Sequence, residues 1–151
     1  MDRMLFDILN YVNEGIIITD DKLNILFWNA QMESLTDIKQ KKALNSNLCE
    51  VLPSLNKNYF KVAINSVMEK GYKYFFCSSI HKGLISDTRN LNVRVNKFEK
   101  HNTKYLIIEC IDVTSQMLRV NQLKEYSNEL YLLNKELKEK EKEIEKLAYY
   151  D

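Results

Sequence analysis

Apolar positions repeat with a helical period at two places in the chain. The first pattern predicts a short N-terminal helix whose apolar face consists of Leu5, Ile8, Leu9 and Val12. The second runs from residue 57 to residue 70 and predicts a longer helix whose apolar face consists of Phe60, Ala63, Ile64, Val67 and Met68. Gly71 follows the second pattern at the position where a helix commonly ends.

Strand-like runs occupy much of the chain between these patterns and residue 112. Residues 16–19 and 23–28 predict a hairpin, and three further strands are expected at 72–80, 90–98 and 104–111. Short helical segments are expected between the two groups, the first after Asn29, a good N-cap. The order predicts an α+β domain with a five-stranded antiparallel sheet and short helices on one face.

From Gln116 onward the pattern changes to a seven-residue repeat. Such a repeat is typical of a coiled coil. A helix of about 30 residues would be ~45 Å long. Its apolar stripe needs a partner helix, most simply the same helix of a second chain in a parallel homodimer. We therefore predict a dimer interface of Leu123, Tyr126, Leu130, Leu133, Leu137, Ile144 and Leu147.

Some residues of this coiled coil are unfavourable in the heptad register described above. Lys140 occupies one of the inner positions, and Glu136 would face Glu141 of the other chain. A second, poorer register keeps the main leucine and isoleucine stripe but places Val120, Ser127, Asn134 and Glu141 at the other inner position of the heptad. We put forward the hypothesis that the helix pair shifts between nearby packings. The alternative is a static dimerisation helix.

Composition excludes several classes of function. The chain has 151 residues with 22 Lys and Arg against 21 Asp and Glu, a net charge of +1. This balance predicts no general attraction to nucleic acid or to an anionic membrane. Three widely spaced cysteines fit neither a disulfide framework nor a zinc site, so we expect no metal and a reducing, cytoplasmic compartment.

Two short motifs resemble those of PAS sensory domains. The first is Asn29-Ala30-x-x-Glu33-x-Leu35-Thr36, which follows a strand ending in Phe27-Trp28; Asp37 and Ile38 then depart from the Gly-Tyr common in the family. The second is Asp112-Val113-Thr114, which resembles the Asp-Ile-Thr motif that joins many PAS domains to an output helix. The resemblance implies a PAS-like sensor over 1–114 and a signalling coiled coil over 115–148.

The resemblance also implies two candidate sites. Asp112 and Thr114 are expected to couple the sensor to the helix, since both can cap a helix N-terminus. PAS folds normally leave a cavity between the sheet and its helices, and here its lining would be Phe60, Ile64, Phe76, Ser78, Arg94 and Cys110. Arg94 would anchor a carboxylate, or it would point to solvent or to Asp112. In a ligand-free domain the same residues would be core.

Catalysis and common PAS cofactors find no support in the sequence. His81 and His101 lie in expected loops, and no phosphate-binding or nucleophile motif is present. The 57–70 helix lacks the histidine that a haem-binding PAS domain would require. Glu50 replaces the arginine expected after Cys49 in a flavin-binding one. We therefore predict no cofactor, although an unknown small ligand remains open.

The last five residues, Leu147-Ala148-Tyr149-Tyr150-Asp151, resemble the opening of a GGDEF domain, the catalytic domain of diguanylate cyclases. We therefore expect residues 149–151 to begin an output domain that makes cyclic di-GMP. One alternative is the sensor of a histidine kinase, although no phosphoacceptor histidine is present on the helix. Another is a ligand-free PAS domain that only dimerises or binds partners.

Overall fold

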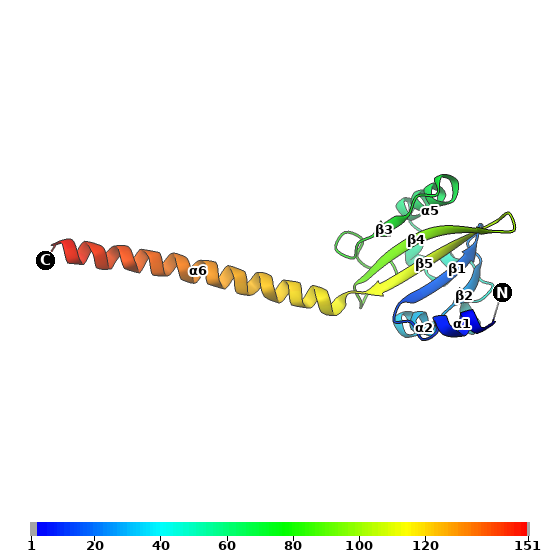
Figure 1. Ribbon diagram of the computed structural model, residues 1–151, viewed down its shortest axis with the longest axis horizontal. Helices are drawn as coiled ribbons and strands as arrows, with labels where there is room; N and C mark the ends of the chain where they lie inside the picture. Colours follow the sequence, from blue (N-terminus) through cyan, green and yellow to red (C-terminus); the bar gives the residue numbers. More distant parts are fainter. Residues whose placement is uncertain (1–2, 151) are drawn as a thin grey trace. The chain divides into compact units, whose positions relative to one another are not determined.

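A computed structural model of the chain describes residues 3–150, and it divides into two compact units at the boundary between Thr114 and Ser115. The first unit is built on a five-stranded antiparallel sheet of order β2-β1-β5-β4-β3 (Figure 1). Its strands are β1 (Gly15–Asp20), β2 (Ile25–Trp28), β3 (Tyr74–Phe76), β4 (Leu91–Lys100) and β5 (Thr103–Asp112). The α+β class and the antiparallel sheet predicted from the sequence are confirmed.

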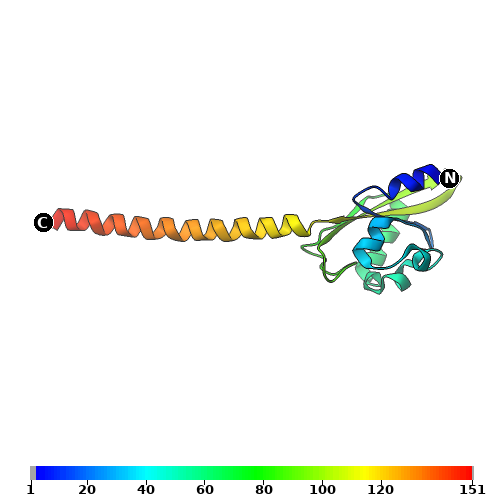
Figure 2. The ribbon, with the colours of Figure 1, turned by 90° about the horizontal axis from the view of Figure 1, so that it is seen from below.

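Helices lie on both faces of this sheet. One face is covered by α2 (Ala30–Thr36), α3 (Gln40–Ala43), α4 (Leu48–Val51), a 3-10 turn (Pro53–Leu55) and α5 (Asn58–Lys70). Figure 2 shows these helices beneath the sheet and α1 (Arg3–Leu9) above it. The main core therefore lies between the sheet and α2–α5, and a smaller apolar cluster lies under α1.

The helical pattern of residues 57–70 is confirmed in α5. Its predicted face is buried against the sheet through Phe60, Ala63, Ile64 and Val67. Gly71 ends the helix in the left-handed conformation, with φ of 71°, and its N–H donates to the carbonyl of Val67. Glycine adopts this conformation without the steric strain that a Cβ would add.

The strand expected at 72–80 is wrong in its length, because only Tyr74–Phe76 pairs with β4. The carbonyl of Cys77 accepts the N–H groups of Ile80 and His81, which turns the chain away from the sheet. The N–H of Ser78 is taken by the side-chain oxygen of Asn92 instead of a strand partner. Residues 77–90 are consequently an irregular loop.

The expected strand at 23–28 begins two residues later than predicted. The Asp20 carboxylate accepts the N–H groups of Lys22 and Asn24 and holds the turn tightly. Leu23 consequently has a positive φ of 67°, outside the extended region. Regular pairing starts at Ile25.

The apolar face predicted for the N-terminal helix is also corrected. Leu5, Ile8 and Val12 are exposed, and α1 ends at Leu9. Phe6 turns toward the sheet instead and stacks on Phe27, with 4.8 Å between the ring centroids. Apolar residues surround most of this helix, so the sequence period alone did not identify the buried side.

The second unit is the continuation of α6 (Thr114–Tyr150), a helix of 37 residues. All seven residues of the predicted dimer interface lie on it and are exposed in the single chain. Among the described residues, no helix has an apolar stretch sufficient for a membrane span. The output domain expected to begin at 149–151 falls partly on α6, and Asp151 lies outside the described residues.

Candidate functional site

The end of β5 and the approach to β4 meet where α6 begins. The strands pair in antiparallel register with Leu91 opposite Asp112. This register brings Arg89 and Asn90, at the end of the 77–90 loop, beside Asp112 and Thr114. All four residues belong to the first unit, which therefore contains the complete junction.

The Asp112 carboxylate connects three parts of this junction. One oxygen, Oδ1, accepts the backbone N–H of Thr114 at 3.0 Å and the hydroxyl of Thr114 at 2.6 Å. The other oxygen, Oδ2, pairs with Nη1 of Arg89 at 3.2 Å. Thr114 is the first residue of α6, so Asp112 satisfies one of the N–H groups that lack an acceptor within the helix. This confirms the capping contact expected from the sequence.

Thr114 carries the connection on to the loop. Its hydroxyl accepts the N–H of Asn90 at 2.9 Å while donating to Asp112. The carbonyl of Asn90 accepts the N–H of Val113 at 2.8 Å. The strand end, the loop and the first residue of the helix therefore form one hydrogen-bonded network, in which a displacement of the loop alters contacts at the helix start.

The network favours the charged form of Asp112. Burial acts to raise the pKa of the carboxyl, but the hydrogen bonds from Thr114 and the Arg89 guanidinium together outweigh burial and hold the pKa below its ordinary value of 3.8. A carboxyl whose pKa is lowered by folding stabilises the folded state above its unfolded pKa. That stabilisation is lost as the pH falls through the folded value.

We expect the Asp112→Asn variant to have a lower free energy of unfolding than the original chain at neutral pH. In acid the free energies of unfolding of the two proteins should become similar. The charge contribution begins to decline near pH 4, the ordinary range of an aspartate, and is lost as the pH falls through the lower pKa of the folded state. Urea unfolding of both proteins at about pH 7 and pH 3 measures the difference. A stability difference that stays constant or grows toward pH 3 would contradict the assigned role of the charge.

The predicted cavity residues fall into two groups. Phe60, Ile64, Phe76 and Cys110 belong to the packed main core, and Ser78 is buried at its margin. The rings of Phe60 and Phe76 lie 5.6 Å apart between centroids. The side chains expected to surround a ligand are thus packed into the protein's own interior.

Arg94 is not part of this group. Its neighbours Val93 and Val95 point into the core, so Arg94 lies on the opposite face of the sheet, exposed to solvent. Its Nη1 pairs with the Glu109 carboxylate at 3.0 Å. The interpretation of Arg94 as an anchor inside a cavity is therefore wrong for this structure, and Arg89 is the arginine that meets Asp112.

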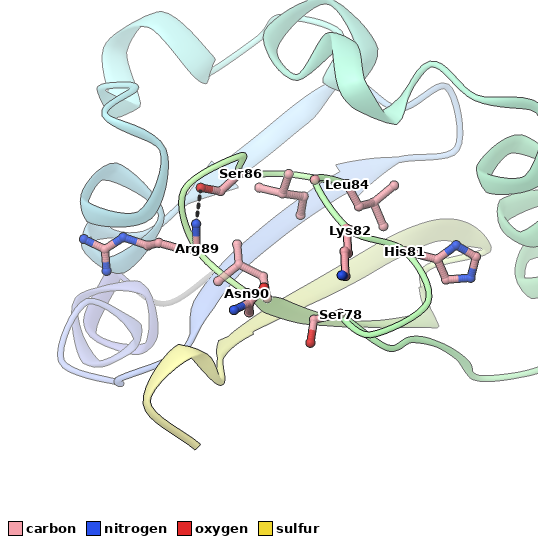
Figure 3. A pocket seen from close by; sticks show the side chains of 10 residues that line it. Ser78, His81, Lys82, Leu84, Ser86, Arg89 and Asn90 are labelled. Atoms are coloured by element: carbon pink, nitrogen blue, oxygen red, sulfur yellow. Dashed lines mark hydrogen bonds between the residues drawn. The ribbon is translucent and has the colours of Figure 1, made fainter. Parts of the chain in front are cut away.

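The 77–90 loop surrounds a small hollow, shown in Figure 3. Its volume is about 10 Å³, which is room for about one water molecule. Leu84 and Ile85 from this loop are buried in the main core, and the Ser54 hydroxyl donates to the Leu84 carbonyl at 2.5 Å. The loop is therefore anchored to the core at its middle and to Asp112 at its end.

The three cysteines lie in different environments. Burial raises the pKa of the Cys110 thiol to about 12, and the neighbouring Glu109 adds to this effect. Burial also raises the pKa of Cys49, against the opposing charge of Lys61. At Cys77, hydrogen bonds from the backbone N–H and then the hydroxyl of Ser79 lower the pKa. Within residues 3–150, no group of three or more metal-binding side chains comes together.

We expect iodoacetamide to modify Cys77 first and Cys110 last in the folded protein. Alkylation requires an accessible thiolate, so Cys110 should react at least about 100-fold more slowly. Peptide mass mapping over a time course at about pH 7.5 measures the three rates. Equal rates at Cys77 and Cys110 would show that the core opens readily.

Sequence reasoning identified Asp112 and Thr114 but missed Arg89 and Asn90. Both missed residues lie in an irregular loop, where no hydrophobic period marks a position. The signal that could have found them is the pairing of the last two strands. Counting back from the His101-Asn102 turn places residue 91 opposite residue 112 and so brings 89 and 90 to the helix start.

Comparison with known proteins agrees with this architecture. The PAS fold family model matches residues 3–77. No curated protein is significantly similar to the chain in sequence. The first unit therefore has an α+β PAS-like fold, and residues 3–77 of it match the PAS fold family.

Solved PAS structures share the fold. A sensory box sensor histidine kinase from Vibrio cholerae is 18% identical, with a TM-score of 0.58 over 74% of this chain and 90% of that chain. The PAS domain of nitrogen regulation protein NR(II) from Vibrio parahaemolyticus is 17% identical, with a TM-score of 0.56 over 74% and 99%. The PAS domain of histidine kinase ThkA is 25% identical, with a TM-score of 0.53 over 66% and 99%.

Proposed function

We propose that this chain is a homodimeric sensory module in which the PAS unit controls the pairing of two α6 helices. The network around Asp112 carries the proposal, because it joins the last strand and the 77–90 loop to the first residue of α6. A signal that moves either element changes the hydrogen bonds at Thr114. The start of the helix then responds directly to the state of the sensor.

The exposed stripe of α6 supports pairing with a second copy. Its seven residues are each between 55% and 69% exposed in the single chain. They repeat at the spacing of a two-stranded coiled coil, and burying one leucine side chain contributes about 1.5–3 kcal/mol. A second α6 supplies the same stripe and so covers it symmetrically.

The polar positions of α6 support a pair that can change its packing. Glu136 and the partner's Glu141 repel each other in one register, and the second register places polar residues inside. The second register is the poorer one, but both share the main stripe of Leu123, Leu130, Leu137 and Ile144. A small change at Thr114 is then enough to shift the balance between them.

For the output of the module we propose a diguanylate cyclase. This part rests on the resemblance of residues 147–151 to the opening of a GGDEF domain. A histidine kinase is the second candidate, supported by the PAS domain of ThkA, which is 25% identical and belongs to a kinase. The two outputs share the same requirement, a dimer of helices that positions two catalytic domains.

The proposal is tested by joining the chain to a GGDEF catalytic domain and measuring conversion of GTP to cyclic di-GMP. Asp112→Asn should change the activity at least about threefold at constant dimer content. Glu109→Gln is the matched control, because Glu109 is also on β5 and paired with an arginine at 3.0 Å, but its partner is Arg94 on the neighbouring strand and not Thr114. Equal activity of all three proteins would refute coupling through Asp112.

The packed core supports a particular form of the proposed sensor. In this form the PAS unit responds to protein contacts and binds no small molecule. Phe60, Phe76 and Cys110, which were expected to line a cavity, are buried in the packed main core. Native mass spectrometry of the chain purified from cells tests this. A dimer mass without any retained molecule would support it, and a dimer with a stoichiometric small molecule would refute it.

A further inference from the structure

Three partly exposed rings gather where the start of α5, β3 and the beginning of the 77–90 loop meet. The buried ring of Phe76 lies at their centre. The rings of Tyr59, Tyr74 and His81 lie 6.2, 5.1 and 5.3 Å from it between centroids. We call these three residues the aromatic surface, of which the two tyrosines are 38% and 41% exposed. An exposed apolar patch bordered by polar residues often marks an interaction site.

The charges around the aromatic surface are mainly positive. Residues 57–82 contain five lysines and one acidic residue. The Nζ atom of Lys57 lies over the Tyr59 ring, 6.0 Å from its centroid, and Lys82 is exposed in the loop. Among the described residues neither of these lysines forms an ion pair, and the Asp87 carboxylate of the loop pairs with neither. Both ammonium groups can therefore meet carboxylates of a partner.

The ring of Tyr59 has little free face. The His81 ring stacks on it with 4.7 Å between the centroids, and Lys57 lies over the same ring. Single-stranded nucleic acids bind largely by stacking bases on free aromatic faces. A tyrosine that presents its edge and hydroxyl instead suits a protein partner, and tyrosine is enriched among the residues that dominate protein interfaces. The complementary partner therefore carries acidic side chains beside apolar ones.

The 77–90 loop connects the aromatic surface to the start of α6. His81 and Lys82 lie at its beginning, and Arg89, which pairs with Asp112, lies near its end. All three loop residues line the same small hollow, as Figure 3 shows. Because side chains do not fill this hollow, a shift of the loop does not have to compress a close-packed interior. A partner that contacts the beginning of the loop can therefore move its end.

We propose that the aromatic surface, together with Lys57 and Lys82, is a docking site for an acidic segment of another protein. Carboxylates of this segment pair with the two lysines, and its apolar side chains cover the exposed tyrosine edges. Docking displaces the 77–90 loop and so alters the network around Asp112. This last step rests on the proposed function, whereas the docking itself does not.

Fluorescence anisotropy of the full chain with a labelled peptide of repeated Glu-Glu-Leu units tests the docking. A peptide of repeated Gln-Gln-Leu units tests whether acidic charge is required, and a labelled thymidine oligonucleotide is the competing probe. A protein with Lys57→Glu and Lys82→Glu reverses the two charges. The matched control carries Lys41→Glu and Lys42→Glu, the same change of charge at two exposed lysines of α3, which lies beside β2 at the other edge of the sheet.

We expect the Lys57→Glu, Lys82→Glu protein to bind the acidic peptide at least about 10-fold more weakly than the original chain, because two attractions become repulsions. The control protein should stay within about twofold, since salt screens charges at the other edge of the sheet. The Gln-Gln-Leu peptide should also bind at least about 10-fold more weakly. No binding of the acidic peptide, equal weakening in both double variants, or tighter binding of the oligonucleotide would overturn the docking site.

The cyclase fusion separates this inference from the proposed function. The acidic peptide should change the activity of the original fusion at least about twofold and leave that of the Asp112→Asn fusion unchanged. Peptide binding without a change of activity, while Asp112→Asn still alters activity, would refute the route through the loop and keep the coupling through Asp112. An Asp112→Asn fusion with unaltered activity would refute the proposed function, and the binding data would still decide the docking site.

Discussion

We expect the Asn29→Ala variant to lose about 4 kcal/mol of folding free energy, because each buried polar group left without a partner costs about 1–3 kcal/mol. The Asn29 side chain is fully buried and makes four hydrogen bonds. Its oxygen accepts the N–H groups of Ile16 and Met32, and its nitrogen donates to the carbonyls of Leu9 and Glu14. Truncation leaves four backbone groups unpaired where α1, β1 and α2 meet.

Urea unfolding followed by circular dichroism measures this loss, with the transition of the PAS unit monitored by the fluorescence of Trp28. The matched control is Asn10→Ala, since Asn10 makes one exposed side-chain bond to Ala30 and should cost about 1 kcal/mol. If the two variants lost similar free energy, the assignment of Asn29 as the central connection of this region would be wrong.

The second large effect is expected in the dimer. Leu130→Glu should raise the dissociation constant at least about 100-fold, since two buried leucines contribute about 1.5–3 kcal/mol each and every 1.4 kcal/mol is tenfold. The substitution also brings two carboxylates together at the helix interface. Sedimentation equilibrium of the full chain over a range of concentrations measures the constant.

The control for this experiment lies two residues away. Leu132 is 58% exposed, close to the 61% of Leu130, but it lies outside the inner positions of both registers. Leu132→Glu makes the same chemical change on the same helix and should leave the dissociation constant within about twofold. Equal weakening by both substitutions would mean that the stripe does not define the interface.

The sequence predicted those features that depend on hydrophobic period and on local motifs. The period of residues 57–70 and Gly71 defined α5 almost completely, and the heptads predicted a long helix where α6 lies. Asp112 and Thr114 were identified from a motif at the end of a strand. In each case the residues that determine the structure are neighbours in the chain.

The missed features depend on contacts between distant segments. Arg89 reaches Asp112 only because β4 and β5 pair in one particular register. The loop residues themselves do not indicate that register, which depends on the pairing of the two strands. The short length of β3 depends on Asn92, whose side chain takes the N–H of Ser78. At α1 the apolar period predicted a face that included Leu5 and Ile8, which are exposed, whereas Phe6 stacks on the distant Phe27 and lies on the buried side.

The central claim is that Asp112 transmits the state of the PAS unit to the α6 pair. Double electron–electron resonance between spin labels at Lys135→Cys of the two chains tests it most directly, in the Cys49→Ser, Cys77→Ser background. Asp112→Asn should shift or broaden the inter-helix distance distribution, and Glu109→Gln should leave it unchanged. An unaltered distribution in the Asp112→Asn protein, with the PAS unit folded, would contradict the claim.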